Sequence, residues 1–388
     1  MTSLQPLNIL FITVWYPNPE NLMHGVFIRE HAKAVSVYDN VRVLHLAGSA
    51  SHSSLESIAD PIITEHLPTF RTVYRRPLSK HISFPFFLWN TWVSFRYLYQ
   101  QGYHPNILHA HIHRAGFPAV LLGWRYKIPV VITEHNSAFP RRLHNRFNIA
   151  LARFAFKQAA WVLPVSKILQ KGIESYGIQA NFRVIPNAVD TSIFFPSETH
   201  RSPKETQRFL FTGSLLPIKG LSYLLEALST LNTPLMDWHL DIVGDGPERS
   251  KYEQQTQLLG LTRRVGFHGY QPKTEIAQLM RETDYFVLPS LWENQSCVLS
   301  EALTCGVPII STMAGGIPEM IDEQTGILVP PGDVAALAEA LRKAMNNELH
   351  FDQGYISKAA VKYQPRIVGN AIHEVYEDAL ACPRNRKH

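Results

Sequence analysis

The feature of this sequence that most constrains its fold is the regular alternation of short apolar runs with longer amphipathic segments. Runs rich in Val, Ile and Leu are typical of strands buried on both faces, and helical patterns such as VFIREHAKAV and DVAALAEALRKAM separate several of them. The predicted strands read NILFITV, VRVLHLA, ILHAHI, PVVITEH, WVLPVS and FRVIPN in the first half, and FLFTGS, WHLDIVG, RVGFHG, YFVLPS, VPIISTM and GILVP in the second. This order predicts an α/β fold with parallel sheets covered by helices on both faces.

The alternation pauses once, in the Pro-, Ser- and Thr-rich stretch PNAVDTSIFFPSETHRSPKETQ. Because 388 residues are too many for one ordinary core, we predict two doubly wound, Rossmann-like domains that face each other across a cleft. The domains span residues 1–185 and 208–364, and residues 186–207 form the linker. Residues 365–388 include the helical pattern PRIVGNAIHEVYEDALA, which we expect to pack back on the first domain.

Composition narrows the class of protein. Hydrophobic residues make up 45% of the chain and charged residues 18%, which is typical of a globular protein. The first residues, MTSLQPLNILFITVWYP, resemble a core strand more than a signal peptide, and we find no run of about 18 apolar residues. The cysteines, Cys297, Cys305 and Cys382, are sparse and lack metal-site spacing. We therefore expect a cytoplasmic protein without disulfides or a zinc site.

The net charge of +5 favours an anionic partner such as a nucleotide, phospholipid or nucleic acid, although it also suits a mildly basic protein without such a partner. An oxidoreductase that binds a dinucleotide is disfavoured because no G-x-G-x-x-G follows the first strand. A serine hydrolase is disfavoured because no G-x-S-x-G is present.

The stretch ENQSCVLSEALTCGVPII places two carboxylates, Glu293 and Glu301, eight residues apart between a predicted strand and the end of a helix. CVLSEALTCG predicts a helix that stops at Gly306, so the amides of residues 295–298 lie at its N-terminus and suit a phosphate. Eight helical residues rise about 12 Å, the scale of a sugar diphosphate. The alternative is structural: Glu293 favours the helix dipole, and Glu301 forms an ion pair.

Three other strand-to-helix turns carry glycines that allow a close approach of backbone to a ligand. GSLLPIKG contains Lys219, a candidate counter-charge for phosphate. STMAGGIPEMI contains Gly315 and Gly316, and HGVFIREHAKAV contains Gly25 in the loop after the first predicted strand.

With these segments in view, the chain resembles the retaining glycosyltransferases of family 4, whose fold is the two-domain GT-B type. The resemblance covers nearly the whole length and rests on an ordered set of segments: HGVFIREHA, ILHAHI, ITEHN, VIPNAVD, GSLLPIKG, IVGDGPE, GFHG, PSLWENQSCVLSEALTCGVPII, GGIPEMI and GILVPPGD. Glu293 and Glu301 match the E-x7-E pair of that family.

The resemblance implies roles for individual residues. Glu301 would bind the ribose of the nucleotide, and Glu293 would lie on the donor sugar. Lys219 would neutralise the diphosphate, and the base would meet the backbone at residues 268–271. The backbone at the helix start would hold sugar hydroxyls and diphosphate; its residues are Asn294, Gln295, Ser296, Cys297 and Val298.

The chain departs from the family at Ser214, where members usually carry Arg, which removes one positive contact to phosphate. His135, in ITEHN, resembles the family histidine that contacts the donor sugar, and we expect it to face the cleft.

HAHIH places His109, His111 and His113 on one face of a strand. A metal site is one interpretation, but no second Asp/His cluster supports it. We favour a wall of the cleft that contacts acceptor, as His109 and His111 match the family pattern, and we expect no metal or other cofactor.

The stretch RTVYRRPLSKHISFPFFLWNTWVSFRYLYQ places basic residues before aromatic ones, which suits an anionic membrane surface such as the inner face of the plasma membrane. The residues concerned are Arg71, Arg75, Arg76, Lys80, Phe84, Phe86, Phe87, Trp89 and Trp92. A second basic run, PRRLHNRFNIALARFAFK, is expected nearby. The alternative is a core helix with a solvated basic end. Nucleic acid is not expected, because no binding motif is present.

The sequence therefore predicts a retaining glycosyltransferase that moves a sugar from a nucleotide-diphospho-sugar to a hydroxyl of a glycan or lipid-linked acceptor, in cell-surface polysaccharide synthesis. Two alternatives stay open. One is a nucleotide-sugar epimerase, which shares the fold. The other is a non-catalytic subunit of a glycosyltransferase complex, which the serine at position 214 would allow.

Overall fold

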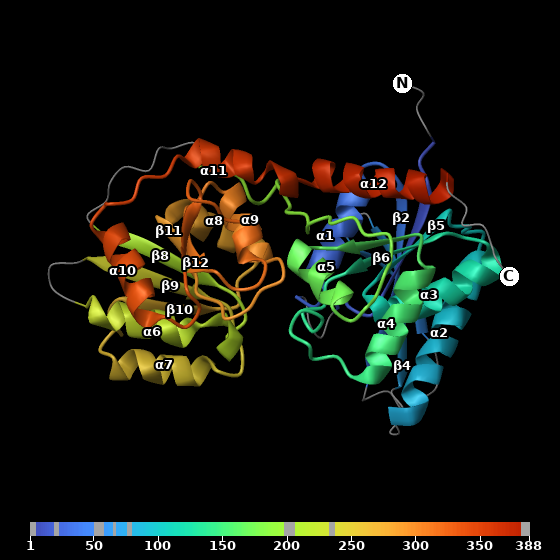
Figure 1. Cartoon of the computed structure of the whole chain (residues 1–388), viewed down its shortest axis with the longest axis horizontal. Helices are drawn as coiled ribbons and strands as arrows, with labels where there is room; N and C mark the ends of the chain where they lie inside the picture. The colour runs from blue at the N-terminus through green and yellow to red at the C-terminus, as the bar shows by residue number, and fades with distance from the viewer. Residues whose placement is uncertain are drawn as a thin grey trace. The chain divides into compact units, whose positions relative to one another are not determined.

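The computed structural model describes residues 5–18, 23–49, 58–64, 67–75, 80–197, 206–232 and 237–381. The chain forms two compact units, which Figure 1 shows in cartoon form. Unit 1 comprises Met1–Ala188 and Pro365–His388, and unit 2 comprises Val189–Gln364. The chain enters unit 2 earlier than the predicted linker implies, because Phe194 is a fully buried core residue of unit 2. Residues 198–205 of that predicted linker lie outside the described residues.

Unit 1 contains a seven-stranded sheet in the order β3-β4-β2-β1-β5-β6-β7. Its strands are β1 (Asn8–Thr13), β2 (Asn40–Ser49), β3 (Ile58–Thr64), β4 (Leu67–Arg75), β5 (Ile107–His111), β6 (Val130–Glu134) and β7 (Trp161–Pro164). All neighbours pair in parallel except β3 and β4, an antiparallel pair that the periodicity did not predict. The predicted strand FRVIPN is wrong: it contributes only an isolated bridge between Phe182 and Val162.

Two hydrophobic cores cover the two faces of this sheet. Its helices are α1 (Val26–Val35), α2 (Lys80–Gln100), α3 (His113–Tyr126), α4 (Arg146–Gln158), α5 (Lys167–Glu174) and α12 (Pro365–Ala381). Along β1, Leu10 and Ile12 join residues of α2, α3 and α4, whereas Ile9 and Phe11 join residues of α1 and α12. Alternate residues of the strand thus face different helices on the two sides of the sheet. The C-terminal helix α12 packs against α1 in unit 1.

Unit 2 contains a six-stranded, all-parallel sheet in the order β10-β9-β8-β11-β12-β13. Every strand predicted in this half is present: β8 (Gln207–Thr212), β9 (Trp238–Val243), β10 (Val265–Gly269), β11 (Tyr285–Leu288), β12 (Ile309–Thr312) and β13 (Gly326–Val329). Its helices are α6 (Leu221–Thr230), α7 (Arg249–Leu258), α8 (Lys273–Glu282), α9 (Cys297–Thr304), α10 (Val334–Met345) and α11 (Gln353–Ala359). Figure 1 shows α6 and α7 on one side of this sheet and α8 and α9 on the other.

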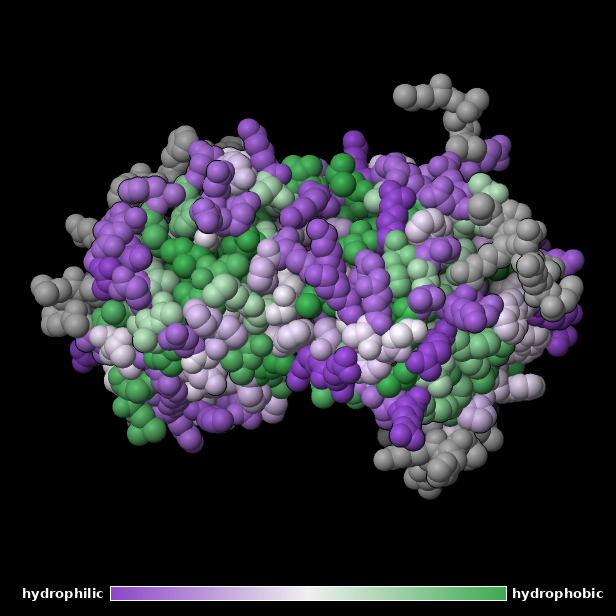
Figure 2. Space-filling view, in the orientation of Figure 1, coloured by the Kyte–Doolittle hydropathy of each residue, from purple (hydrophilic) through white to green (hydrophobic). Residues whose placement is uncertain are grey.

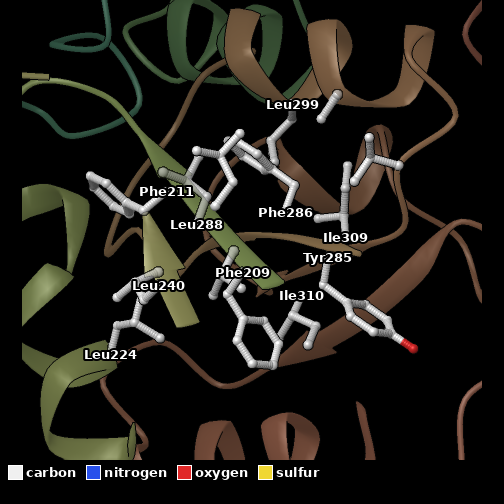
Figure 3. Close-up of a cluster of buried hydrophobic side chains, with 14 of the residues drawn as sticks. Phe209, Phe211, Leu224, Leu240, Tyr285, Phe286, Leu288, Leu299, Ile309 and Ile310 are labelled. Carbon is white, nitrogen blue, oxygen red and sulfur yellow. The ribbon is translucent and has the colours of Figure 1, made fainter. Parts of the chain in front are cut away.

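The core of unit 2 fixes the position of α9. Figure 3 shows Leu299 of α9 extending towards Phe286 of β11 and Ile309 of β12. All three side chains are fully buried. Burying a side chain of this size stabilises the fold by about 1.5–3 kcal/mol, so α9 is held firmly at the end of the sheet.

Among the described residues, no helix combines the length and apolar composition needed to cross a bilayer. Several large apolar side chains are nevertheless exposed, including Trp89 and Phe147 of unit 1. Figure 2 shows hydrophobic residues interspersed with hydrophilic ones over one face of the molecule.

Candidate active site

The strand order of unit 2 creates a natural ligand site. Chain order runs outward from β8 through β9 to β10, then crosses over to β11 and continues to β13. From the neighbouring strands β8 and β11 the chain therefore continues in opposite directions along the sheet. Open parallel sheets bind ligands at the carboxyl ends of two such strands. The loops after β8 and β11 touch: Leu291 N–H donates to the carbonyl of Ile218 at 2.8 Å. At Gly220 (φ 72°) an added Cβ would lie 1.9 Å from the Pro289 carbonyl oxygen, so only glycine fits.

Glu293 and Lys219 meet at this point. Lys219 ends the short 3-10 helix Pro217–Lys219 after β8, and Glu293 lies in the loop between β11 and α9. The Lys219 Nζ atom lies 2.6 Å from Oε1 of Glu293, and the Ser290 hydroxyl donates to the same oxygen at 2.8 Å. Both side chains are mostly buried, with 22% and 11% exposure, so the carboxylate is held in one position.

The turn after β12 supports Glu293 from its backbone. Gly316 N–H donates to the Glu293 carbonyl at 2.9 Å. Gly315 has φ 58°, and an added Cβ there would lie 2.0 Å from the same carbonyl oxygen. The Gly315–Gly316 pair was predicted to approach a ligand; in the structure its close approach is to the backbone of Glu293.

Glu301, the second member of the pair, lies within α9 and is 6% exposed. Its Oε1 atom lies 3.3 Å from Nζ of Lys273, the first residue of α8. Lys273 was not predicted from the sequence. The signal available was its position shortly after the GFHG strand, at the start of the helix that follows. Each carboxylate of the pair therefore faces one lysine, which adds a second cation to the site.

The predicted helix is present but shorter, because α9 begins at Cys297 and ends at Thr304, with Gly306 (φ 69°) just beyond it. Glu293 lies before this helix, so the 12 Å helical rise predicted between the carboxylates does not apply to the whole interval. The N-terminus of α9 carries Asn294, Gln295 and Ser296, all at most 9% exposed. Its dipole and backbone amides favour an anion there.

Cys297 lies at the first position of α9, next to Val298. Burial raises the pKa of its thiol to about 12, and the Glu301 carboxylate adds to the effect. Since the thiolate is the reactive form, the raised pKa disfavours a nucleophilic role for this cysteine. The groups that this part of the site offers to a ligand are therefore the backbone amides of α9 and the carboxylates of Glu293 and Glu301.

Ser214 is exposed in the loop that follows β8. The loop is fixed by its neighbours: Gly213 N–H donates to the Val243 carbonyl, and Leu215 N–H donates to the Asp245 carbonyl at 2.9 Å. The side chain at position 214 thus projects from a well-anchored backbone, where a longer basic residue would fit.

In unit 1, His135 follows β6 and is 9% exposed. Its Nε2 atom lies 3.2 Å from Nδ1 of His111, at the end of β5. Burial lowers the pKa of both imidazoles well below 6.5, with smaller effects from neighbouring histidines, so both are neutral at pH 7.

The fully buried Glu134 anchors this region and was also missed. Its carboxylate accepts hydrogen bonds from the backbone N–H groups of His113, His135 and Asn136 at 2.8–3.0 Å, and from Nδ1 of His113 at 2.9 Å. It therefore ties the start of α3 to the loop that carries His135. Between β5 and α3, Ile112 adopts φ 65°, ψ 149°, a strained conformation for a β-branched residue.

Two other expectations for unit 1 need correction, and Gly25 has a structural role of its own. His109 is fully buried and bonds to Tyr376 at 2.6 Å and Thr133 at 2.7 Å, so it is a core residue and does not form a wall. His113 lies in α3 and does not share the strand face of His109 and His111. Gly25 (φ 70°) caps α1, and an added Cβ would lie 2.5 Å from the Trp15 carbonyl, so local packing requires glycine here, while its approach to a ligand stays a prediction.

Unit 1 also contains a cavity of about 680 Å³ beside these loops. Its lining combines aromatic faces with hydrogen-bonding groups from the ends of β1, β5 and β6 and from α2 and α4. The residues include Trp15, His24, Tyr74, Phe87, Arg114, Asn136, His144 and Asn148. Such a mixture suits a polar ligand with flat apolar faces.

The predicted basic and aromatic stretch divides into buried and exposed parts. Arg71 is buried, where its Nε donates to His45 Nδ1 at 3.1 Å, so it does not belong to a surface patch. Phe87 is also buried, whereas Trp89 is 65% exposed. The side chains of Arg75, Arg76 and Lys80 lie outside the described residues.

The second basic run does lie next to α2, since Phe84 contacts Phe147 of α4 with ring centroids 5.4 Å apart. We call the exposed residues of this run the basic-aromatic surface: Arg141, Arg142, Leu143, Arg146 and Phe147.

Comparison with known proteins agrees with this architecture. Residues 26–193 match the model of glycosyltransferase family 4, and residues 194–362 match that of glycosyl transferases group 1. The chain is 29% identical to a glycogen synthase of Mycobacterium tuberculosis over 258 residues, 64% of this chain and 62% of that protein. It is 26% identical to a D-inositol 3-phosphate glycosyltransferase of Corynebacterium jeikeium over 308 residues, 72% of this chain and 74% of that one.

Among solved structures, HepE of Anabaena in complex with UDP superposes with a TM-score of 0.74 at 21% identity, covering 96% of this chain and all of HepE. This similarity identifies the fold as GT-B. The two family models together match residues 26–362, and the E-x7-E pair lies at the switch point of unit 2. The chain therefore belongs to the family 4 (group 1) glycosyltransferases.

Proposed function

We propose that the chain is a retaining glycosyltransferase that transfers a sugar from a nucleoside-diphospho-sugar to an acceptor hydroxyl. The observation that carries this proposal is the pairing of Glu293 with Lys219 and of Glu301 with Lys273 around the N-terminus of α9. Two carboxylates can accept hydrogen bonds from sugar hydroxyls, while the lysines and the helix N-terminus attract a diphosphate.

In this proposal the parts of the donor take different partners. Glu301 binds the ribose, the α9 amides and Lys219 hold the diphosphate, and Glu293 lies against the transferred sugar. The structures of HepE with UDP and with UDP-glucose support a donor of this chemical class. When the donor enters, Lys219 exchanges part of its contact with Glu293 for phosphate oxygens, which frees the carboxylate for a sugar hydroxyl.

The proposed reaction needs no resident metal or cofactor. The bond between the anomeric carbon and the phosphate oxygen breaks, the acceptor oxygen forms a bond on the same face, and the leaving phosphate accepts the acceptor proton. Negative charge grows on the diphosphate as the bond breaks, so preorganised cations and amides lower the barrier. His135 is proposed to contact the donor sugar as a neutral imidazole, which its lowered pKa favours.

We propose that the acceptor occupies the cavity of unit 1. Trp15, Tyr74 and Phe87 offer faces on which a sugar ring can pack, and Asn136 and Asn148 offer hydrogen bonds to hydroxyls. A glycan or lipid-linked sugar fits this lining. The relatives act in different processes, and a role in cell-surface polysaccharide synthesis is part of the proposal.

The basic-aromatic surface supports peripheral contact with an anionic membrane, at the inner face of the plasma membrane. Arg141, Arg142 and Arg146 can attract acidic headgroups while Leu143 and Phe147 enter the interface. Sedimentation with vesicles tests this part. Arg142→Glu should release the protein from phosphatidylserine vesicles, and Lys251→Glu, on an exposed helix of unit 2, is the control. Equal binding of both variants would refute the membrane contact.

The experiment that tests the function follows release of nucleoside diphosphate with UDP-, GDP- and ADP-sugars, with and without a panel of glycan and glycolipid acceptors. A transferase releases nucleotide rapidly only when acceptor is present, and the product keeps the anomeric configuration of the donor. Interconversion of the donor without acceptor would indicate an epimerase. Donor binding, seen as a higher melting temperature, without turnover across the panel would indicate a non-catalytic subunit.

A further inference from the structure

Unit 1 brings three histidines together from three separate elements. His31 lies on α1, His111 ends β5, and His135 follows β6. All three are buried, with exposures of 0%, 0% and 9%. One ring nitrogen from each lies within 4.8 Å of the others. The HAHIH motif contributed one member, whereas His31 is 80 positions away and carried no signal of its own.

The rings of His31 and His135 each have a partner from outside the cluster. His31 Nε2 lies 3.1 Å from the carbonyl oxygen of Pro186, so this nitrogen carries the proton and Nδ1 has a free lone pair. His135 is hydrogen-bonded by the side chain of Asn187. Histidines that bind metals usually have the second nitrogen fixed in this way by a carbonyl or amide group.

Two ring nitrogens of this cluster have no partner in the described part of the chain. Nδ1 of His31 and Nε2 of His111 are buried and have no hydrogen-bond partner among the described residues. An imidazole lone pair enclosed in this way requires an explanation, and a bound ion is one of the few available. Across the cluster, His111 Nδ1 and His135 Nε2 are 3.2 Å apart. Two nitrogens bound to one tetrahedral zinc at about 2.0–2.1 Å would be about 3.4 Å apart.

We propose that His31, His111 and His135 form a binding site for one transition-metal ion. A set of three imidazoles without a carboxylate suits Zn²⁺, Co²⁺, Ni²⁺ or Cu²⁺ and does not suit Mg²⁺ or Ca²⁺. The hydrogen bond between His111 and His135 breaks on binding, and water takes the fourth position.

A bound ion would link α1, β5 and the loop after β6, and it would occupy the lone pair of His135. The site itself does not depend on the proposed transfer reaction. If that reaction uses His135, however, the metal-bound state and the donor-contacting state exclude each other. Zn²⁺ would then inhibit transfer reversibly, with chelator restoring it.

The test uses the full chain without an affinity tag. Equilibrium dialysis against Zn²⁺ with elemental analysis should find one tightly held ion per chain, and Co²⁺ should give the intense visible absorption of a four-coordinate ion with nitrogen ligands. His31→Gln and His111→Gln should each weaken binding at least ten-fold. His268→Gln is the matched control for metal binding, since it changes a surface histidine that is paired with Asp241. This variant should keep the ion.

Two results would overturn the proposal. One is wild-type protein that holds no ion at micromolar Zn²⁺; the other is equal binding by wild type and His31→Gln. If the variants fail to fold, the Co²⁺ spectrum of the wild type decides alone, because a weak six-coordinate spectrum is incompatible with this site. The melting temperature gives a further readout, since Zn²⁺ should raise it in wild type and control only.

Discussion

Lys219 and Glu293 form an ion pair of 2.6 Å although 74 positions separate them. They come from the loops after β8 and β11, the neighbouring strands at which the chain order of unit 2 reverses. The pair thus connects the two sides of the topological switch point. In the proposed reaction, the same lysine and carboxylate would serve the leaving diphosphate and the transferred sugar.

Removing either member of this pair should slow transfer more than it weakens donor binding. For Lys219→Met we expect kcat to fall roughly 10²–10³-fold, the usual effect of losing one electrostatic stabiliser of a transition state. Glu293→Gln should lower kcat with little change in nucleotide affinity. Steady-state kinetics and calorimetric titration with nucleoside diphosphate separate the two effects. Unchanged kcat in both variants would contradict the assigned roles.

Glu301→Gln should mainly weaken nucleotide binding. A charge-assisted hydrogen bond contributes about 1.5–3 kcal/mol, so we expect roughly a ten- to hundred-fold rise in the Kd for nucleoside diphosphate. The matched control is a nucleotide that lacks the ribose 2′-hydroxyl. The Kd values of wild type and variant for this nucleotide should differ less than those for the nucleoside diphosphate. Equal loss of affinity for both nucleotides would show that Glu301 does not contact this part of the ribose.

Ser214→Arg should strengthen binding of the diphosphate. The position is exposed on an anchored loop, so the larger side chain adds a cation without displacing core residues. We expect about a ten-fold lower Kd for nucleoside diphosphate at low salt, a gain that shrinks as ionic strength rises. Ser214→Gln, similar in length but neutral, is the control. No gain with Arg would place the diphosphate away from this loop.

Gly315→Ala should destabilise unit 2 more than Gly260→Ala. Both glycines have positive φ, 58° and 70°, so alanine costs about 1–2 kcal/mol of backbone strain at each. Only at Gly315 would the new Cβ also meet the Glu293 carbonyl, at 2.0 Å, whereas nothing lies within 4 Å at Gly260. Urea unfolding measures the difference. A donor-affinity loss confined to Gly315→Ala would show that this contact positions Glu293.

The buried His45 should make stability depend on pH. Burial, Arg71 and His24 lower its pKa to about 3, against an ordinary value of 6.5. The unfolded chain therefore binds the proton first, and stability present above pH 6.5 is lost as pH falls towards 3. His45→Gln should flatten the slope of unfolding free energy between pH 6 and pH 4 by about 1.4 kcal/mol per pH unit. The control is His350→Gln, which changes an exposed histidine and should leave this slope unchanged. A metal chelator in the buffer keeps bound ions from contributing to the measurement.

The local structure of this protein was largely readable from its sequence. The six strands of unit 2 were predicted, and α1 and α12 coincide with the segments VFIREHAKAV and PRIVGNAIHEVYEDALA. The reason is that hydrophobic periodicity reports directly on which side of a strand or helix is buried. The E-x7-E pair could be found in the same way, because strand, loop and helix succeed one another within one short stretch.

Tertiary structure alone decided which distant residues meet. Lys273 pairs with Glu301, Glu134 fastens the loops after β5 and β6, and His31 joins His111 and His135. Arg71 is a further example. The sequence places it in a basic stretch expected at the surface, but in the structure it is buried against His45. Sequence spacing fixes the face on which a side chain lies, but its partner depends on how strands separated in the chain become neighbours in the sheet, and that is a property of the whole packed fold.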